Sequence, residues 1–180
     1  MFRRLARVRL AGSLRRGETV DMTMLEVPRA IHRGEEEIPF VSLGDGTHIQ
    51  LLQVDEEKGL WVIRTKFDSG VTIPTHKHTG EVFAFTISGK WKYLEYPEVN
   101  TAGSYLYEPA GSIHTLTVPD DAVDTDVWFA IYGANLNLDP DGSVNMVIDA
   151  GLIKEYYFAL CEAEGKPRPN VVGADRPPLN

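Results

Sequence analysis

Between residues 38 and 146, short apolar runs are separated by turn-forming residues, at a spacing of about 8–12 residues. Alternation with a period of two is typical of β-strands that bury one face. The pattern predicts strands at residues 47–54, 60–67, 71–78, 82–88, 91–96, 104–107, 115–118 and 126–132. Ser88-Gly89 is interpreted as a hairpin turn between two of them. So many short strands indicate an all-β barrel or sandwich.

The period changes after residue 148. Apolar residues from Leu152 to Leu160 recur at helical spacing, which predicts a helix over residues 149–164 that ends at Gly165. Residues 166–180 contain four prolines and are expected to be extended. The chain is therefore divided into an N-terminal arm (1–37), one β-barrel domain (38–148), and a C-terminal helix with a Pro-rich tail (149–180).

Composition narrows the classes of function. An apolar content of 43% is enough for one sizeable core, and the net charge of −8 argues against a nucleic-acid partner. No apolar run approaches the roughly 20 residues that span a bilayer, so no membrane association is expected. The single cysteine, Cys161, cannot form an internal disulfide, and this favours a cytoplasmic setting.

The N-terminus differs in charge from the rest. The first 17 residues carry six arginines and no acid. Such a segment is read as a transit peptide, as a basic arm without a chemical role, or as sequence upstream of a start at Met22 or Met24.

The strongest chemical signal is His76-Lys77-His78 in a predicted strand. Residues i and i+2 of a strand point to the same face, so both imidazoles can reach one point. Neutral imidazole is the commonest transition-metal ligand, but two exposed histidines would have the same spacing. Of the other histidines, His32 and His48 lack a partner at metal spacing and are interpreted as structural.

The surrounding residues resemble the two motifs of the cupin superfamily, G-x5-H-x-H-x3–4-E-x6-G and G-x5-P-x-G-x2-H-x3-N. Gly70, His76, His78 and Gly89 keep the spacing of the first motif. The second is kept by Gly103, Pro109, Gly111 and His114. The resemblance implies a single-domain jelly-roll barrel with one metal ion held by His76, His78 and His114. Gly111 is expected to permit the tight turn that presents His114.

Two positions depart from the motifs. Val118 replaces the final asparagine, and Val82 occupies the position of the glutamate. Glu81 is one residue away from that position, which in a strand means the opposite face unless a bulge intervenes.

A denser resemblance, over residues 78–80, 89–96 and 101–109, is to the 2,4'-dihydroxyacetophenone dioxygenase group of cupins. This group cleaves a hydroxyketone with O2 to an aromatic acid and formate. The resemblance implies an Fe(II) dioxygenase acting on a hydroxyketone or diketone. It also implies a glutamate that joins the three histidines, for which Glu95 is the candidate; a solvated charge is the alternative.

Several alternatives stay open. Zinc, manganese or nickel would suit a non-redox isomerase, lyase or hydrolase, and zinc would also suit a non-catalytic sensor. By analogy with other cupins a homodimer or homotetramer is expected. One set of aromatic residues could line a pocket for an aryl ketone, although most are expected to be core: Phe83, Phe85, Trp91, Tyr93, Tyr105, Tyr107 and Trp128.

Overall fold

The computed structural model describes residues 29–175. The Arg-rich segment and residues 176–180, for which the sequence analysis made predictions, lie outside this range. A short 3-10 helix at Glu35–Glu37 precedes the strands. The strands and the helix that follow are β1 (Val41–Ser42), β2 (Thr47–Asp55), β3 (Leu60–Phe67), β4 (His76–His78), β5 (Val82–Ser88), β6 (Lys90–Tyr93), β7 (Val99–Thr101), β8 (Tyr105–Glu108), β9 (Ile113–His114), β10 (Leu116–Thr117), β11 (Thr125–Tyr132), β12 (Asn135–Leu138), β13 (Val144–Ile148) and α1 (Ala150–Ala163).

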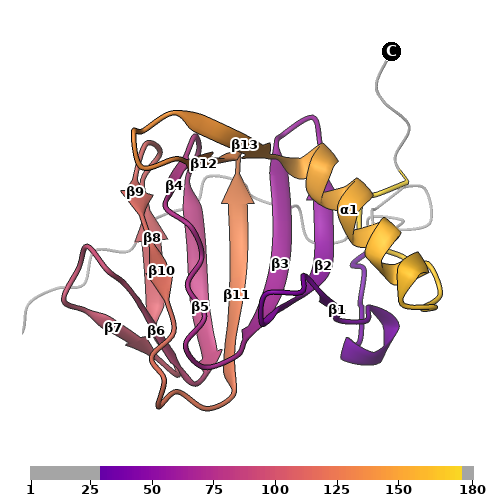
Figure 1. The fold of residues 1–180 in the computed structure, drawn as a ribbon. Coiled ribbons are helices and arrows are strands. Elements are labelled where there is room, and N and C mark those ends of the chain that lie inside the picture. The colour runs from indigo at the N-terminus through magenta and orange to yellow at the C-terminus, as the bar shows by residue number, and fades with distance from the viewer. Residues whose placement is uncertain (1–28, 176–180) are drawn as a thin grey trace, which may run out of the picture. The chain divides into compact units, whose positions relative to one another are not determined.

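Three antiparallel sheets form the barrel (Figure 1). One wall is a six-stranded sheet in the order β1-β2-β3-β11-β5-β8. The opposite side is built from two smaller sheets, β10-β6-β7 and β13-β12-β4-β9. The predicted all-β cupin architecture with a C-terminal helix is confirmed.

Alternation along the strands determines which residues face the interior. On β3, Trp61, Ile63 and Phe67 are buried and belong to the hydrophobic core, while Arg64 and Lys66 alternate with them on the other face. Arg64 forms an ion pair there with Asp126 (2.6 Å between Nη2 and Oδ2). The inner face of the large sheet is therefore mainly apolar, and the metal-ligand candidates of the opposite side face it.

The structure corrects the predicted hairpin at Ser88-Gly89. β5 pairs with β11 and β8, whereas β6 pairs with β10 and β7, so the two strands belong to different sheets. Gly89 is a corner between sheets, with a φ of 69°. A Cβ atom there would lie 2.4 Å from the Cα atom of Thr125, so the corner also requires the absence of a side chain.

The C-terminal segment packs on the barrel. Asp149 caps α1 by accepting a hydrogen bond from the backbone N–H of Leu152 (2.9 Å), and Gly165 follows the helix with a φ of 67°. Beyond the helix, the backbone N–H of Val54 on β2 donates to Val172 (2.8 Å). Within residues 29–175, no helix has the length and apolar character that crossing a bilayer requires.

The aromatic residues proposed to line a pocket lie in different places. Trp91 and Tyr93 are buried, and only Tyr93 of the seven borders the central cavity. Phe85, Tyr105 and Tyr107 are exposed on the outer face of the large sheet, with Tyr105 64% exposed. Phe83 and Trp128 are half-buried, so the expectation that most of the seven residues are core is wrong: only Trp91 and Tyr93 belong to the core. A homo-oligomer, for which such a face would be suited, stays a prediction.

We expect the two glycine corners to differ in how strongly they tolerate alanine. Gly103→Ala should cost about 1–2 kcal/mol, because its φ of 86° is unfavourable but no heavy atom lies within 4 Å of the added Cβ. Gly89→Ala should cost at least about 3 kcal/mol, because the backbone of Thr125 must also move. Urea unfolding of both variants measures this difference. Equal losses would contradict the packing role of Gly89.

Candidate metal centre

The first two histidines come from alternate positions of one short strand. β4 has the burial pattern buried, half-buried, buried, so His76 and His78 face the interior and Lys77 faces outward. β4 is paired on both sides, with β12 and β9, and this fixes its orientation. The predicted same-face placement of the two imidazoles is present in the structure.

The third histidine is positioned by a tight turn. His114 lies directly opposite His76 in the pairing of β9 with β4. The preceding turn has the backbone N–H of Ser112 donating to Pro109 (3.1 Å), and that of Gly111 donating to the carbonyl of His78 (2.8 Å). Gly111 has a φ of 90°, in the region that favours glycine, which agrees with the role predicted for it.

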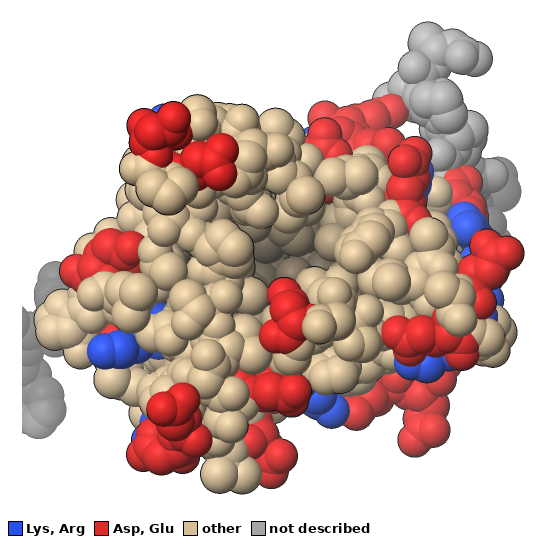
Figure 2. Space-filling view, viewed as in Figure 1, with Lys and Arg blue, Asp and Glu red and all other residues tan. Residues whose placement is uncertain are grey.

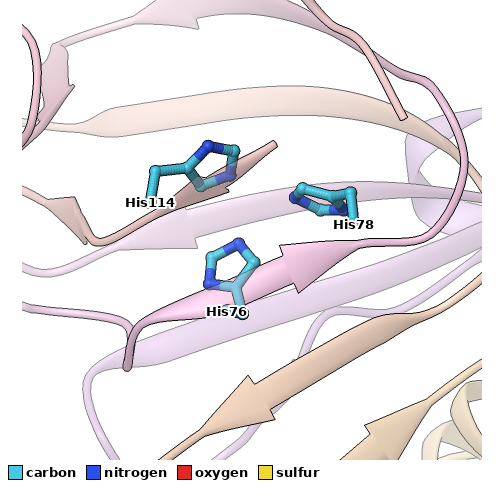
Figure 3. Close-up of side chains that lie close together, drawn as sticks. All are labelled: His76, His78 and His114. Atoms are coloured by element: carbon cyan, nitrogen blue, oxygen red, sulfur yellow. The ribbon is translucent and has the colours of Figure 1, made fainter. Parts of the chain in front are cut away.

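The three rings converge (Figure 3). One potential ligand atom from each histidine lies within 4.8 Å of the others. The side chains are nearly inaccessible to solvent, with exposed fractions of 6% for His76, 3% for His78 and 1% for His114. Within residues 29–175, His76, His78 and His114 form the one group of three or more histidine, cysteine or acidic side chains whose potential ligand atoms lie this close together. The three residues can hold one metal ion.

His76 is held in the form that a metal ligand needs. Burial lowers its pKa to about 4, which keeps the ring neutral near pH 7. Its Nδ1 lies 2.8 Å from the carbonyl oxygen of Pro74. A proton on Nδ1 satisfies this hydrogen bond and leaves the lone pair of Nε2 available for coordination.

A fourth donor, Glu108 on β8, was missed by the sequence analysis. Its side chain is buried, and Oε2 lies 3.0 Å from Nε2 of His78 and 3.1 Å from Nε2 of His114. The other carboxylate oxygen, Oε1, accepts a hydrogen bond from the hydroxyl of Tyr93.

The contacts of Glu108 fit a metal better than hydrogen bonds. Although the distances are short, Glu108 Oε2 and His114 Nε2 are buried without a hydrogen-bond partner. Two lone pairs that face each other in this way are unfavourable unless a cation lies between them. Ligands at about 2.1 Å from one ion lie about 3.0–3.4 Å from each other, which matches this spacing. The donor set therefore fits a divalent metal.

The other proposed acids lie outside the cluster. Glu95 is exposed, and its Oε2 accepts a hydrogen bond from the backbone N–H of Thr115 (2.9 Å). Glu81 is also exposed and accepts a hydrogen bond from the hydroxyl of Tyr107 (2.9 Å). The structure thus corrects the assignment of Glu95 as fourth ligand, and the nearby carboxylate is that of Glu108. His32 and His48 are not part of the cluster.

Register explains where the carboxylate comes from. Val82, at the position that the cupin motif gives to glutamate, pairs directly with Glu108 on the neighbouring strand β8. Directly opposed residues of an antiparallel pair share one face, so Glu108 reaches the same region from another strand. The available signal in the sequence was alternation in residues 105–108, which places Leu106 and Glu108 on one face.

A cavity of about 150 Å³ adjoins the histidines, and Figure 2 shows this face of the molecule hollowed at a centre bounded mainly by uncharged residues. His76, His78 and Glu108 border it. The rest of its wall is mostly apolar, formed by Leu43, Ile49, Trp61, Ile63, Phe67, Ile73, Val82, Leu116, Phe129, Ile131, Ile148 and Ile153, together with Tyr93, Thr47, Thr65 and Asn135.

This combination of an antiparallel barrel with inward histidines defines a cupin. Residues 29–130, more than half of the chain, match the model of the ChrR cupin-like domain. The chain belongs to this family, and membership of the cupin superfamily is confirmed. Among curated proteins, none matches the chain significantly.

Solved structures agree on the fold. A protein of unknown function with a cupin-like fold from Ralstonia eutropha JMP134 is 37% identical, with a TM-score of 0.78, covering 87% of this chain and 99% of its own. An RmlC-like cupin from the same strain is 24% identical (TM-score 0.73; 79% and 93% covered). An acetylacetone dioxygenase from Acinetobacter johnsonii is 19% identical (TM-score 0.65; 74% and 93% covered).

We expect the chain to bind one divalent metal through the three histidines. His78→Ala or His114→Ala should weaken binding by more than the 10- to 100-fold that loss of an outer residue typically costs. His48→Ala, a change outside the cluster, should leave affinity unchanged. Competitive titration with a chromophoric zinc chelator measures this, and circular dichroism verifies folding. If folded His114→Ala bound the metal as tightly as His48→Ala, the assignment of the three histidines as metal ligands would be wrong.

Glu108 and Glu95 provide a second, matched comparison. Glu108→Gln should lower metal affinity about 10- to 100-fold, because the buried negative charge beside the ion is lost. Glu95→Gln should change it less than twofold, because Glu95 is exposed and bonded to the backbone. A loss confined to Glu95→Gln in the same titration would restore the original assignment.

Proposed function

We propose that the chain is a mononuclear Fe(II) dioxygenase that cleaves a carbon–carbon bond in a small hydroxyketone or diketone, with 2,4'-dihydroxyacetophenone and O2 as the specific pair. The observation that carries this proposal is a set of three buried histidines, of which His76 and His78 border an apolar cavity. The acetylacetone dioxygenase of the same fold acts, by its name, on a diketone, which supports this class of substrate.

Bound iron would supply a Lewis acid with open positions for a chelating substrate and for oxygen. His76, His78 and His114 would hold the ion, and their neutral rings leave its charge available to an anionic chelate. The apolar wall of the cavity orients the body of the substrate and excludes water from the reacting carbon atoms.

Glu108 and Tyr93 form a hydrogen-bonded pair beside the metal centre. The carboxylate of Glu108 borders the cavity, where its Oε2 would accept a hydrogen bond from the hydroxyl of a bound hydroxyketone and orient it. The hydroxyl of Tyr93 donates to Oε1 and holds the carboxylate in place. Burial and the neighbouring carboxylate raise the pKa of Tyr93 well above its ordinary value, so Tyr93 remains a donor.

The second candidate is a non-catalytic zinc module, favoured by the ChrR cupin-like family and by Glu108. If Glu108 joined His76, His78 and His114, the four side chains would fill the four positions that zinc prefers and would leave none for a substrate. A non-redox isomerase, lyase or hydrolase would instead keep one position open for water. Metal identity and oxygen consumption separate these possibilities.

Loaded anaerobically with Fe(II), the full chain should consume one O2 for each molecule of 2,4'-dihydroxyacetophenone cleaved to an aromatic acid and formate. His114→Ala should abolish this consumption, and His48→Ala should retain it. An oxygen electrode and product chromatography make the measurement, with 2-hydroxyketones and β-diketones as further substrates. Stoichiometric zinc and no uptake after reconstitution with iron would reject the dioxygenase and leave the zinc module.

A further inference from the structure

Two threonine hydroxyls in the cavity wall have no partner. Thr47 on β2 is 2% exposed and Thr65 on β3 is 3% exposed, and both border the cavity. Neither Oγ1 atom has a hydrogen-bond partner in the structure. A buried polar group without a hydrogen-bond partner is unfavourable, and two such groups in one cavity wall could both be satisfied by a bound molecule.

The two hydroxyls lie in the same part of the cavity wall. In the pairing of β2 with β3, Thr47 lies opposite Phe67, and Ile49 lies opposite Thr65. Thr47 and Thr65 are therefore diagonal neighbours on the inner face. Each hydroxyl can both donate and accept, which suits a ligand hydroxyl.

The threonines and the metal centre occupy different ends of the cavity. Glu108 pairs with Val82, which pairs with Ile131, which pairs with Trp61, so these residues form one row across the sheet. Thr65 lies four residues beyond Trp61 on β3, about 13 Å along an extended strand. Ile63 and Phe129, in the wall between them, are apolar.

Thr86 is a buried threonine of the same sheet whose hydroxyl does have a hydrogen-bond partner within the protein. It lies in one row with Thr65, because both pair with Val127 of β11 from opposite sides. Its Oγ1 accepts a hydrogen bond from the indole N–H of Trp91 (2.9 Å). The unpartnered state of Thr65 is therefore not a general property of threonines on this face.

We propose that Thr47 and Thr65 form a recognition site for the hydroxyl of a phenolic ligand whose opposite end faces the metal centre. This inference rests on the proposed function for the chelating end, and it adds the two residues that would recognise the phenolic hydroxyl and so favour a 4-hydroxyaryl ketone over an alkyl diketone. A cavity of about 150 Å³ accommodates the benzene ring of such a ligand.

The test uses two probes of one shape, 4-methylphenol and toluene, with the zinc-loaded full chain, in which no oxidation can occur. Calorimetric titration should show that Thr65→Val or Thr47→Val weakens binding of 4-methylphenol about fivefold to tenfold. Toluene should change less than twofold, because valine keeps the shape of threonine. Thr86→Val should lower the melting temperature yet preserve the ratio of the two affinities.

A second measurement links the site to the substrate. The affinity for 2,4'-dihydroxyacetophenone should exceed that for 2-hydroxyacetophenone in the wild type, and the double variant should lose this preference. Because the titrations measure binding alone, they give the same answer if no oxygen is consumed, so failure of the oxygenase proposal is seen separately. An affinity ratio that neither Thr47→Val nor Thr65→Val changes would overturn the phenol site.

Discussion

The pairing of His76 with His114 across two short strands is the contact on which the rest of the site depends. The i, i+2 spacing provides two imidazoles on one face, and the register of β9 against β4 adds the third. A shift of one residue would turn His114 outward. The turn at Gly111, bonded to the carbonyl of His78, opposes such a shift because it ties the approach to β9 to the strand it pairs with. Backbone hydrogen bonds thereby determine the geometry of the metal ligands.

Burial of so many polar groups in an apolar cavity needs compensation from within the site. Four titratable side chains lie together, namely three imidazoles and the carboxylate of Glu108, with the hydroxyl of Tyr93 beside them. A neutral set of histidines avoids the desolvation cost of several positive charges, while the carboxylate balances part of the charge of a bound cation. The same carboxylate therefore suits both a closed zinc site and the orientation of a substrate hydroxyl, and the two candidate functions differ in whether it occupies a coordination position.

The sequence was informative where spacing is local. Alternation predicted β2, β3, β5 and β11, and the spacing of His76, His78 and His114 predicted which imidazoles converge. The sequence predictions were wrong where the position of a residue depends on pairing between strands that are distant in the sequence. Alternation in residues 105–108 shows only that Glu108 shares a face with Leu106; that Glu108 lies opposite Val82, close to the histidines, follows from pairing between strands. Glu95 was favoured as the acid of a supposed strand, but β6 ends at Tyr93 and leaves Glu95 at the surface. The hairpin at Gly89 failed for the same reason, since a short turn looks alike in sequence whether it joins neighbours or crosses between sheets.

The cavity wall is formed by residues from two parts of the chain, one that matches the model of the ChrR cupin-like domain and one that lies beyond it. All three histidines and Glu108 lie within residues 29–130, the part that corresponds to the ChrR cupin-like domain, whereas Asn135, Ile148 and Ile153 come from beyond it. Ile153 belongs to α1, which packs against the barrel from outside. Part of the cavity wall is thus formed by a segment that contains none of the metal-ligand candidates. A substitution in α1 or β13 can therefore change the shape of the cavity, and with it the range of ligands that fit, without changing any candidate metal ligand.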